Sequence, residues 1–341
     1  MTEFRKLKAA ELSDRPGPKK AGQAREDHET NLAVRAAWLQ FVGGHSQGEI
    51  SDLLALSRTK VNRLIAQAQR EGRVKVFIEG SAESCLMLER DLCSMFALES
   101  CDVVPNVSTM DPPFDVLGVA GARYLMRLAD DGEVKLVGVG TGRTLSAMAE
   151  YVPQITRSDL DFVSLLGTFR RSTAVDPYDV VHLLAAKVSG RCFALPVPFV
   201  VDSPETREVL LSQTFIRPII EMQAEADVKI VGVGSISPAT HIVEIGMLTR
   251  DEMAELKKRG AAAEAAGQFF DSDGRQIVSR ISDRMIGHSA EDLKRGRTIV
   301  IAGGSAKPRA IDAALRAGFC THLITDEWTA GQIVLRREKD G

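Results

Sequence analysis

Near the start of the chain, apolar and polar residues alternate with the period of a helix. A first helix is predicted over 29–42, because its apolar residues recur every three or four positions: Leu32, Ala36, Leu39 and Val42. Two further helices are predicted over 47–54 and 58–71, since Ser46 and Ser57 are placed to cap their first turns. The pattern therefore predicts a small helical domain, which we place at residues 28–80.

The second and third predicted helices have the spacing of a helix-turn-helix. We expect apolar residues of both helices to face inward: Ile50, Leu53, Leu56, Val61, Leu64 and Ile65. The alternating residues 74–78 predict a short strand, a possible wing. A recognition helix reads base edges with the residues of its first turns. The candidate DNA contacts are the polar residues around the two helix starts: Gln47, Ser57, Arg58, Thr59, Lys60, Asn62 and Arg63. The alternative is a solvated helix face.

Charge divides the chain unevenly. Residues 1–80 hold 14 Lys and Arg against 10 Asp and Glu, a net of +4, whereas residues 81–341 hold 29 against 36, a net of −7. A basic segment ahead of an acidic body fits a DNA-binding module. Residues 1–27 are rich in charge and poor in bulky apolar residues, so we predict a disordered arm there, more simply a loose tail than a DNA contact.

From residue 81 onward, short apolar strands alternate with helices. One unit occurs three times, an apolar strand that runs into a glycine loop and then a helix, at 135–142, 229–235 and 298–305. Continuously apolar strands alternating with helices predict a parallel α/β sheet covered on both faces. Ligands bind such sheets at the carboxyl ends of the strands, where all three glycine loops would lie.

The first and third glycine loops have the composition of a phosphate site. Glycines let backbone amides approach an anion, and a helix start carries partial positive charge. The candidate ligands of the two loops are Gly140, Thr141, Gly142, Arg143, Thr144, Gly303, Gly304, Ser305 and Lys307. Arg143 stands where a dinucleotide fingerprint needs its third glycine, which argues against that motif. A plain strand-to-helix turn also needs glycine, so each loop alone is a weak signal.

Glu264 stands in a run of alanines and glycines, where its carboxylate could accept hydrogen bonds from sugar hydroxyls. A solvated helix residue is the simpler interpretation of this position taken alone. The rival class of function is a sugar-phosphate isomerase or deaminase with an added N-terminal module. Such chemistry needs a positioned base and acid, for which Glu264, Asp326 and His182 are candidates. His182 lies in an apolar run, so a packed helix histidine is expected there.

Other classes of protein are disfavoured. The five cysteines include no C-x-x-C motif, and the histidines lack metal-ligand spacing, so we expect free thiols with neither a metal nor a cofactor. The sequence has no stretch of 18 apolar residues and no secretory signal, which predicts a cytoplasmic protein without a membrane contact.

Several motifs in a fixed order resemble the SorC family of bacterial sugar-binding transcription regulators. They are the helix-turn-helix at 46–71, the sequence Gly140 to Thr144, Leu195-Pro196-Val197-Pro198, the run 267–274, Ala302 to Lys307, and Leu323 to Glu327. The segments 143–147 and 32–42 are most similar to the branch that regulates sugar-alcohol catabolism, such as erythritol regulators. Two positions depart from the family pattern, since alanine replaces glycine at Ala55 in the turn and at Ala263 before the carboxylate.

The resemblance implies a regulator whose DNA affinity is controlled by a phosphorylated sugar or polyol. It implies an effector domain over 81–341, related to sugar-phosphate isomerases and deaminases but without their reaction. It further implies a homotetramer on operator DNA. By motif position, Arg143 and Thr144 would hold the phosphate with Lys307, and Glu264 would bind the sugar hydroxyls.

Overall fold

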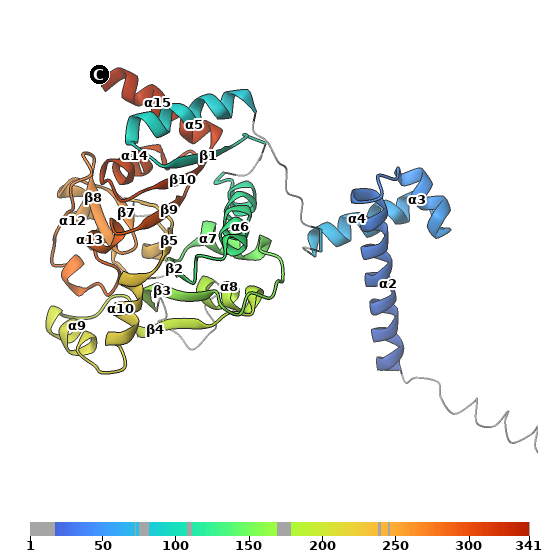
Figure 1. The fold of residues 1–341 in the computed structure, drawn as a ribbon, viewed down its shortest axis with the longest axis horizontal. Helices are drawn as coiled ribbons and strands as arrows, with labels where there is room; N and C mark the ends of the chain where they lie inside the picture. Colours follow the sequence, from blue (N-terminus) through green and yellow to red (C-terminus); the bar gives the residue numbers. More distant parts are fainter. Residues whose placement is uncertain are drawn as a thin grey trace, which may run out of the picture. The chain divides into compact units, whose positions relative to one another are not determined.

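The computed structural model describes residues 18–71, 73–74, 82–107, 111–168, 179–237, 240–244 and 246–340. The chain forms two compact units, Met1–Val76 and Phe77–Gly341 (Figure 1). The predicted boundary between residues 80 and 81 lies outside the described residues. No helix in the described ranges is both long and apolar enough to cross a membrane.

Three helices make up the described part of the first unit, namely α2 (Pro18–Phe41), α3 (Gln47–Leu54) and α4 (Arg58–Arg70). The predicted starts of α3 and α4 are confirmed, but α2 begins earlier than residue 29. The helix thus includes residues 18–27, where we predicted a disordered arm. These residues are mostly good helix formers, and a proline is tolerated in a first turn, so a charged segment can extend a helix that packs further along. Residues 1–17 lie outside the described residues.

The small core of this unit joins all three helices. Its buried residues are Ala33, Ala36, Ala37, Ile50, Val61, Leu64, Ile65 and Ala68, with Leu32, Leu39, Leu54, Leu56 and Val74 packed against them. Leu53, which we predicted to face inward, is instead exposed at 59%, and Val42, the last apolar residue of the predicted first helix, is exposed at 67%. Val42 follows the end of α2, and Leu54 takes the inward position predicted for Leu53. Residues 75–78 of the predicted wing are outside the described residues.

The turn between α3 and α4 is locally well defined. Ser46 and Glu49 form a capping box at the start of α3, and the Ser57 hydroxyl accepts a hydrogen bond from the Lys60 amide at the start of α4. Ala55 adopts φ 53° and ψ 42°, the left-handed conformation that glycine adopts more easily. The turn thus keeps a glycine-like conformation with an alanine in place of glycine.

The second unit is an α/β domain around a seven-stranded sheet, in the order β1-β10-β9-β5-β2-β3-β4 (Figure 1). Every neighbouring pair is parallel, which confirms the predicted parallel sheet. The strands are β1 (Ser100–Val104), β2 (Leu136–Val139), β3 (Asp161–Thr168), β4 (Cys192–Pro198), β5 (Val228–Val231), β9 (Arg297–Ile301) and β10 (His322–Asp326).

Helices cover both faces of this sheet. One face packs on α6 (Phe114–Asp131), α7 (Arg143–Tyr151) and α8 (Val180–Val188), and the other on α5 (Glu83–Phe96), α14 (Pro308–Arg316) and α15 (Glu327–Asp340). The remaining helices are α9 (Pro204–Leu211), α10 (Arg217–Glu225), α11 (His241–Glu244), α12 (Arg250–Lys258), α13 (Ala290–Leu293) and the 3-10 turn η1 (Ser282–Arg284). Strands buried on both faces explain the continuous apolar runs in the sequence.

A second sheet of three antiparallel strands lies beside the large one. It consists of β6 (Gly234–Ser235), β7 (Ala261–Ala265) and β8 (Gln268–Asp271). Glu264 is therefore a strand residue and not a helix residue. Alternate small residues of β7 are buried, so the strand lies close to α14 and turns Glu264 toward the cavity described next.

Candidate effector site and DNA-binding helix

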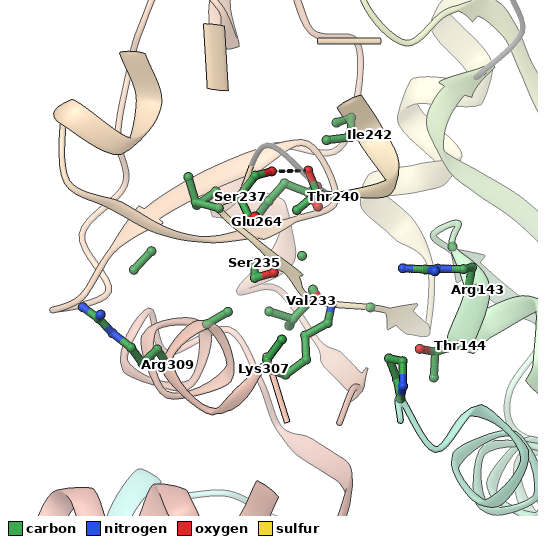
Figure 2. Close-up of a pocket in the computed structure, with 18 of the residues that line it drawn as sticks. Arg143, Thr144, Val233, Ser235, Ser237, Thr240, Ile242, Glu264, Lys307 and Arg309 are labelled. Carbon is green, nitrogen blue, oxygen red and sulfur yellow. Dashed lines mark hydrogen bonds between the residues drawn. The ribbon is translucent and has the colours of Figure 1, made fainter. Parts of the chain in front are cut away.

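The second unit contains a cavity of about 890 Å³ at the carboxyl ends of β2, β5 and β9. All three glycine loops contribute to its wall, as the strand-to-loop pattern predicts (Figure 2). Of the predicted effector residues, those that line the cavity are Gly140, Thr141, Gly142, Arg143, Thr144, Glu264, Ser305 and Lys307. Residues from 111 to 310 thus converge on one site.

The first glycine loop leaves the start of α7 open. Gly142 has φ +128°, and a Cβ added to it would meet no atom within 4 Å, so the loop conformation, and not crowding, requires glycine there. Among the hydrogen bonds between described residues, none is donated by the backbone amide of Arg143 or of Thr144. The Arg143 guanidinium lies 5.3 Å from the centre of the Phe114 ring. Figure 2 shows Arg143 reaching into the pocket.

The third glycine loop is different, because its donors already have partners within the chain. The Gly304 amide donates to Asp326 Oδ2 (2.8 Å) and to Thr329 Oγ1 (3.0 Å). The Ser305 amide donates to Asp111 Oδ1 (2.9 Å), and its hydroxyl donates to the other Asp111 oxygen. Gly303 and Gly304 are buried and are not among the lining residues. The structure therefore places Gly303 and Gly304 outside the cavity lining, with the Asp326 carboxylate packed against them, whereas we predicted that they contact the effector.

Lys307 and Glu264 face each other beside the third loop. Lys307 Nζ donates to the Val233 carbonyl, while Glu264 Oε1 accepts from the Gly267 amide at 2.8 Å. Burial lowers the pKa of Lys307 and raises the pKa of Glu264, and each charge partly offsets the shift of the other. The ammonium group therefore has a carbonyl and a carboxylate near it before any ligand binds.

The individual residues of the second glycine loop were not among the predicted effector contacts, although the repeated pattern places this loop at the same end of the sheet. Val233, Gly234, Ser235 and Ser237 line the cavity, and Thr240 Oγ1 donates to the Ser237 carbonyl at 2.9 Å (Figure 2). Gly234 pairs with Glu264, and a Cβ on it would come within 2.7 Å of Glu264 Oε2. The signal in the sequence is the repeated strand-and-glycine pattern, since this loop carries no charged side chain that would mark it as a binding site.

Comparisons with known proteins agree with this architecture. Residues 81–335 match the family profile of a sugar-binding domain. The Brucella abortus protein named erythritol catabolism regulatory protein EryD is 38% identical over 308 residues, which cover 90% of this chain and 98% of that protein. The chain belongs to the SorC family of sugar-binding transcriptional regulators.

Two further proteins show how far this SorC-family likeness extends. The transcriptional regulator LsrR of Klebsiella pneumoniae is 30% identical over 311 residues, covering 90% of this chain and 93% of that protein. The full-length sorbitol operon regulator SorC from Klebsiella pneumoniae superposes with a TM-score of 0.69 at 24% identity, covering 89% of this chain and 98% of that one. This structural likeness shows that this chain and the sorbitol operon regulator have the same fold.

In this SorC-family chain, the outer face of α4 is polar and accessible. Gln47, Ser57, Arg58, Thr59, Asn62 and Arg63 are exposed, and Lys60 is half-buried. A Cβ on Gly48 would lie 3.1 Å from Arg58 Nη2, so the Arg58 side chain lies against α3. Arg63 pairs with Glu29 of α2 at 2.6 Å. The predicted DNA-contact residues thus lie accessible or half-buried at the start of α3 and along the first two turns of α4.

The three acid–base candidates of the rival enzyme function do not converge. Asp326 is buried beneath the third loop, where it accepts hydrogen bonds from Gly304 and Thr329. His182 is exposed on α8 and pairs with Asp179 at 2.7 Å, so it is not the packed histidine that its apolar neighbours predict. Of the three, Glu264 alone lines the cavity. The five cysteines are free thiols, and within the described ranges no cluster of metal-binding side chains occurs.

Proposed function

We propose that this regulator binds operator DNA through α4 and that a phosphorylated sugar or polyol in the cavity controls its affinity for DNA. The observation that carries the proposal is the first glycine loop, where the open start of α7, the Thr144 hydroxyl and the Arg143 guanidinium face one cavity. Amides at a helix start and an arginine together favour a phosphate group. The cavity volume suits a small metabolite.

The rest of the effector would extend toward the second and third loops. Glu264 and Ser235 offer an acceptor and a hydroxyl to sugar hydroxyls, with Lys307 beside them. We assign the phosphate to Arg143 and Thr144 and give Lys307 the hydroxyl end, because its ammonium group already faces Val233 and Glu264. The names of the relatives, which include an erythritol regulator, support control of sugar or polyol catabolism.

DNA binding requires more than one copy of the chain. A single helix-turn-helix makes few contacts, and operators mirror the symmetry of the oligomer that binds them. We therefore propose a homotetramer in the cytoplasm. An effector shifts such an assembly between two arrangements of its DNA-binding units only by as much as its affinities for the two arrangements differ.

The DNA contacts are tested with an operator duplex selected from random DNA by the full chain. Arg58→Ala should weaken binding by about 1–3 kcal/mol, and Arg63→Ala by less, because Arg63 must first leave Glu29. Arg336→Ala, an exposed arginine of α15, is the matched control and should leave binding unchanged. Fluorescence anisotropy at fixed salt measures all three variants. Operator affinity equal to wild type in both α4 variants would contradict this docking.

We further propose that the cavity binds its ligand without catalysing a reaction. Of the three predicted acid–base residues, Glu264 alone lines the cavity, and the reaction needs both a base and an acid. Pentose and hexose phosphates should therefore not be converted to product. Product formation from any of these sugar phosphates by the purified chain would favour the enzyme alternative.

A further inference from the structure

Asp111 occupies the position on the third glycine loop that sequence reasoning gave to a phosphate. Its Oδ1 accepts a hydrogen bond from the Ser305 amide, and its second oxygen accepts one from the Ser305 hydroxyl. A Cβ on Gly304 would lie 2.9 Å from Asp111 Oδ1, so this carboxylate lies directly against the loop. Asp111 and Ser305 both line the effector cavity. The carboxylate of the chain itself thus binds the loop as an anion would.

Among the described residues beside the first and third glycine loops, one cationic side chain has no carboxylate next to it. Arg143, beside the open start of α7, has no ion pair among the described residues. Lys307 lies opposite the carboxylate of Glu264, which offsets its charge. Asp111 adds a negative charge at the third loop, and hydrogen bonds from Ser305 hold the pKa of its carboxyl below the ordinary value. A phosphate placed there would meet an ionised carboxylate and occupied amides.

We propose that Asp111 determines specificity by excluding a second phosphate, so that the cavity accepts monophosphates and rejects bisphosphates. This inference rests on the proposed function, which places one phosphate at Arg143 and Thr144. The proposed function leaves the ligand of the third loop open. This inference assigns that loop to the carboxylate of Asp111 and identifies bisphosphates as the effectors that do not bind.

Two other cations lie at the margin of the cavity and do not replace the third loop. Lys257 and Arg309 are exposed lining residues. Figure 2 shows the Arg309 side chain directed away from Lys307, on the side of the pocket opposite Arg143. A long exposed side chain is screened by water and loses rotamer freedom when it binds, so it stabilises a phosphate less than backbone amides held in a loop do.

The test compares matched pairs of effectors on the full chain by calorimetric titration. The pairs are fructose 6-phosphate with fructose 1,6-bisphosphate and ribulose 5-phosphate with ribulose 1,5-bisphosphate. Wild type should bind the monophosphate of at least one pair about tenfold or more tightly than its bisphosphate. Asp111→Asn keeps an oxygen to accept from the Ser305 amide but removes the charge, so it should lower this preference about tenfold. Asp115→Asn removes the same charge from the first turn of α6, outside the lining residues, and should leave the preference within twofold.

Thermal unfolding of each variant checks that the fold is intact, and the outcomes separate the two proposals. If no monophosphate and no inorganic phosphate binds wild type at millimolar concentration, the phosphate assignment in the proposed function fails and this inference fails with it. If a monophosphate binds but its bisphosphate binds equally well, or if Asp111→Asn leaves the preference unchanged, the inference about Asp111 alone is wrong.

Discussion

The first and third glycine loops look alike in sequence and differ in what their backbone amides bind. Both follow a buried parallel strand, and both lead into a helix at the same end of the sheet. The first loop presents an open helix start at Arg143 and Thr144. In the third loop, Gly304 and Ser305 already donate to carboxylates of the chain. A glycine loop therefore fixes the backbone path, while residues far away in the sequence decide whether its amides remain available to a ligand.

Adding a methyl group to each loop gives the largest expected contrast. A Cβ on Gly303 would lie 2.1 Å from Asp326 Oδ2, so Gly303→Ala should destabilise the fold by about 3 kcal/mol through overpacking. Gly142→Ala meets open space and suffers from its φ of +128° alone, which should cost about 1 kcal/mol. Urea unfolding of the two variants measures the difference. Equal losses of stability would mean that the third loop is no more tightly packed than the first.

The two loops should also respond differently when a polar side chain is removed. Arg143→Ala should weaken binding of a sugar monophosphate by about 1.5–3 kcal/mol, because a charge-assisted contact is lost. Ser305→Ala should change this affinity by less than about 0.5 kcal/mol, since Ser305 already bonds Asp111. Calorimetric titration with fructose 6-phosphate provides the measurement. A larger loss in Ser305→Ala than in Arg143→Ala would reverse the assignment of the two loops.

The smallest expected effect is that of pH on the affinity for a sugar monophosphate. Arginine keeps its charge at all working pH values, and a phosphate monoester is fully ionised well above pH 6, so affinity should stay within about twofold between pH 7.5 and 9.5. Burial lowers the pKa of Lys307, so rising pH would remove its proton before that of an ordinary lysine. A phosphate held by Lys307 would consequently bind more weakly at high pH. If affinity for the sugar phosphate fell at high pH while affinity for the unphosphorylated sugar did not, the phosphate would have to bind at the third loop, beside Lys307.

The sequence predicted the features that depend on local chemistry. The capping serines Ser46 and Ser57 predicted the starts of α3 and α4 correctly, and the apolar runs predicted the parallel strands that carry the glycine loops. Arg143 and Thr144 of the first loop line the cavity, and their contact with an effector stays a prediction. These features follow from periodicity, caps and turns within a few residues of one another.

What the sequence did not predict depends on contacts between distant segments. Asp111 reaches Ser305 from a different loop, and no local pattern marks either residue as a partner of the other. Glu264 lies in a strand because β7 pairs with β6 and β8, although its alanine-rich surroundings favour a helix by propensity. Leu53 was assigned to the wrong face of α3 because a helix of eight residues gives its apolar pattern too little length to distinguish Leu53 from Leu54.

A crystal structure of the full chain with a bound sugar monophosphate tests the difference between the two loops most directly. We predict that the phosphate lies at the amides of Arg143 and Thr144, with the Arg143 guanidinium beside it, and that Asp111 remains hydrogen-bonded to Ser305. A phosphate bound to the Ser305 amide and Lys307, with Asp111 displaced, would contradict the account.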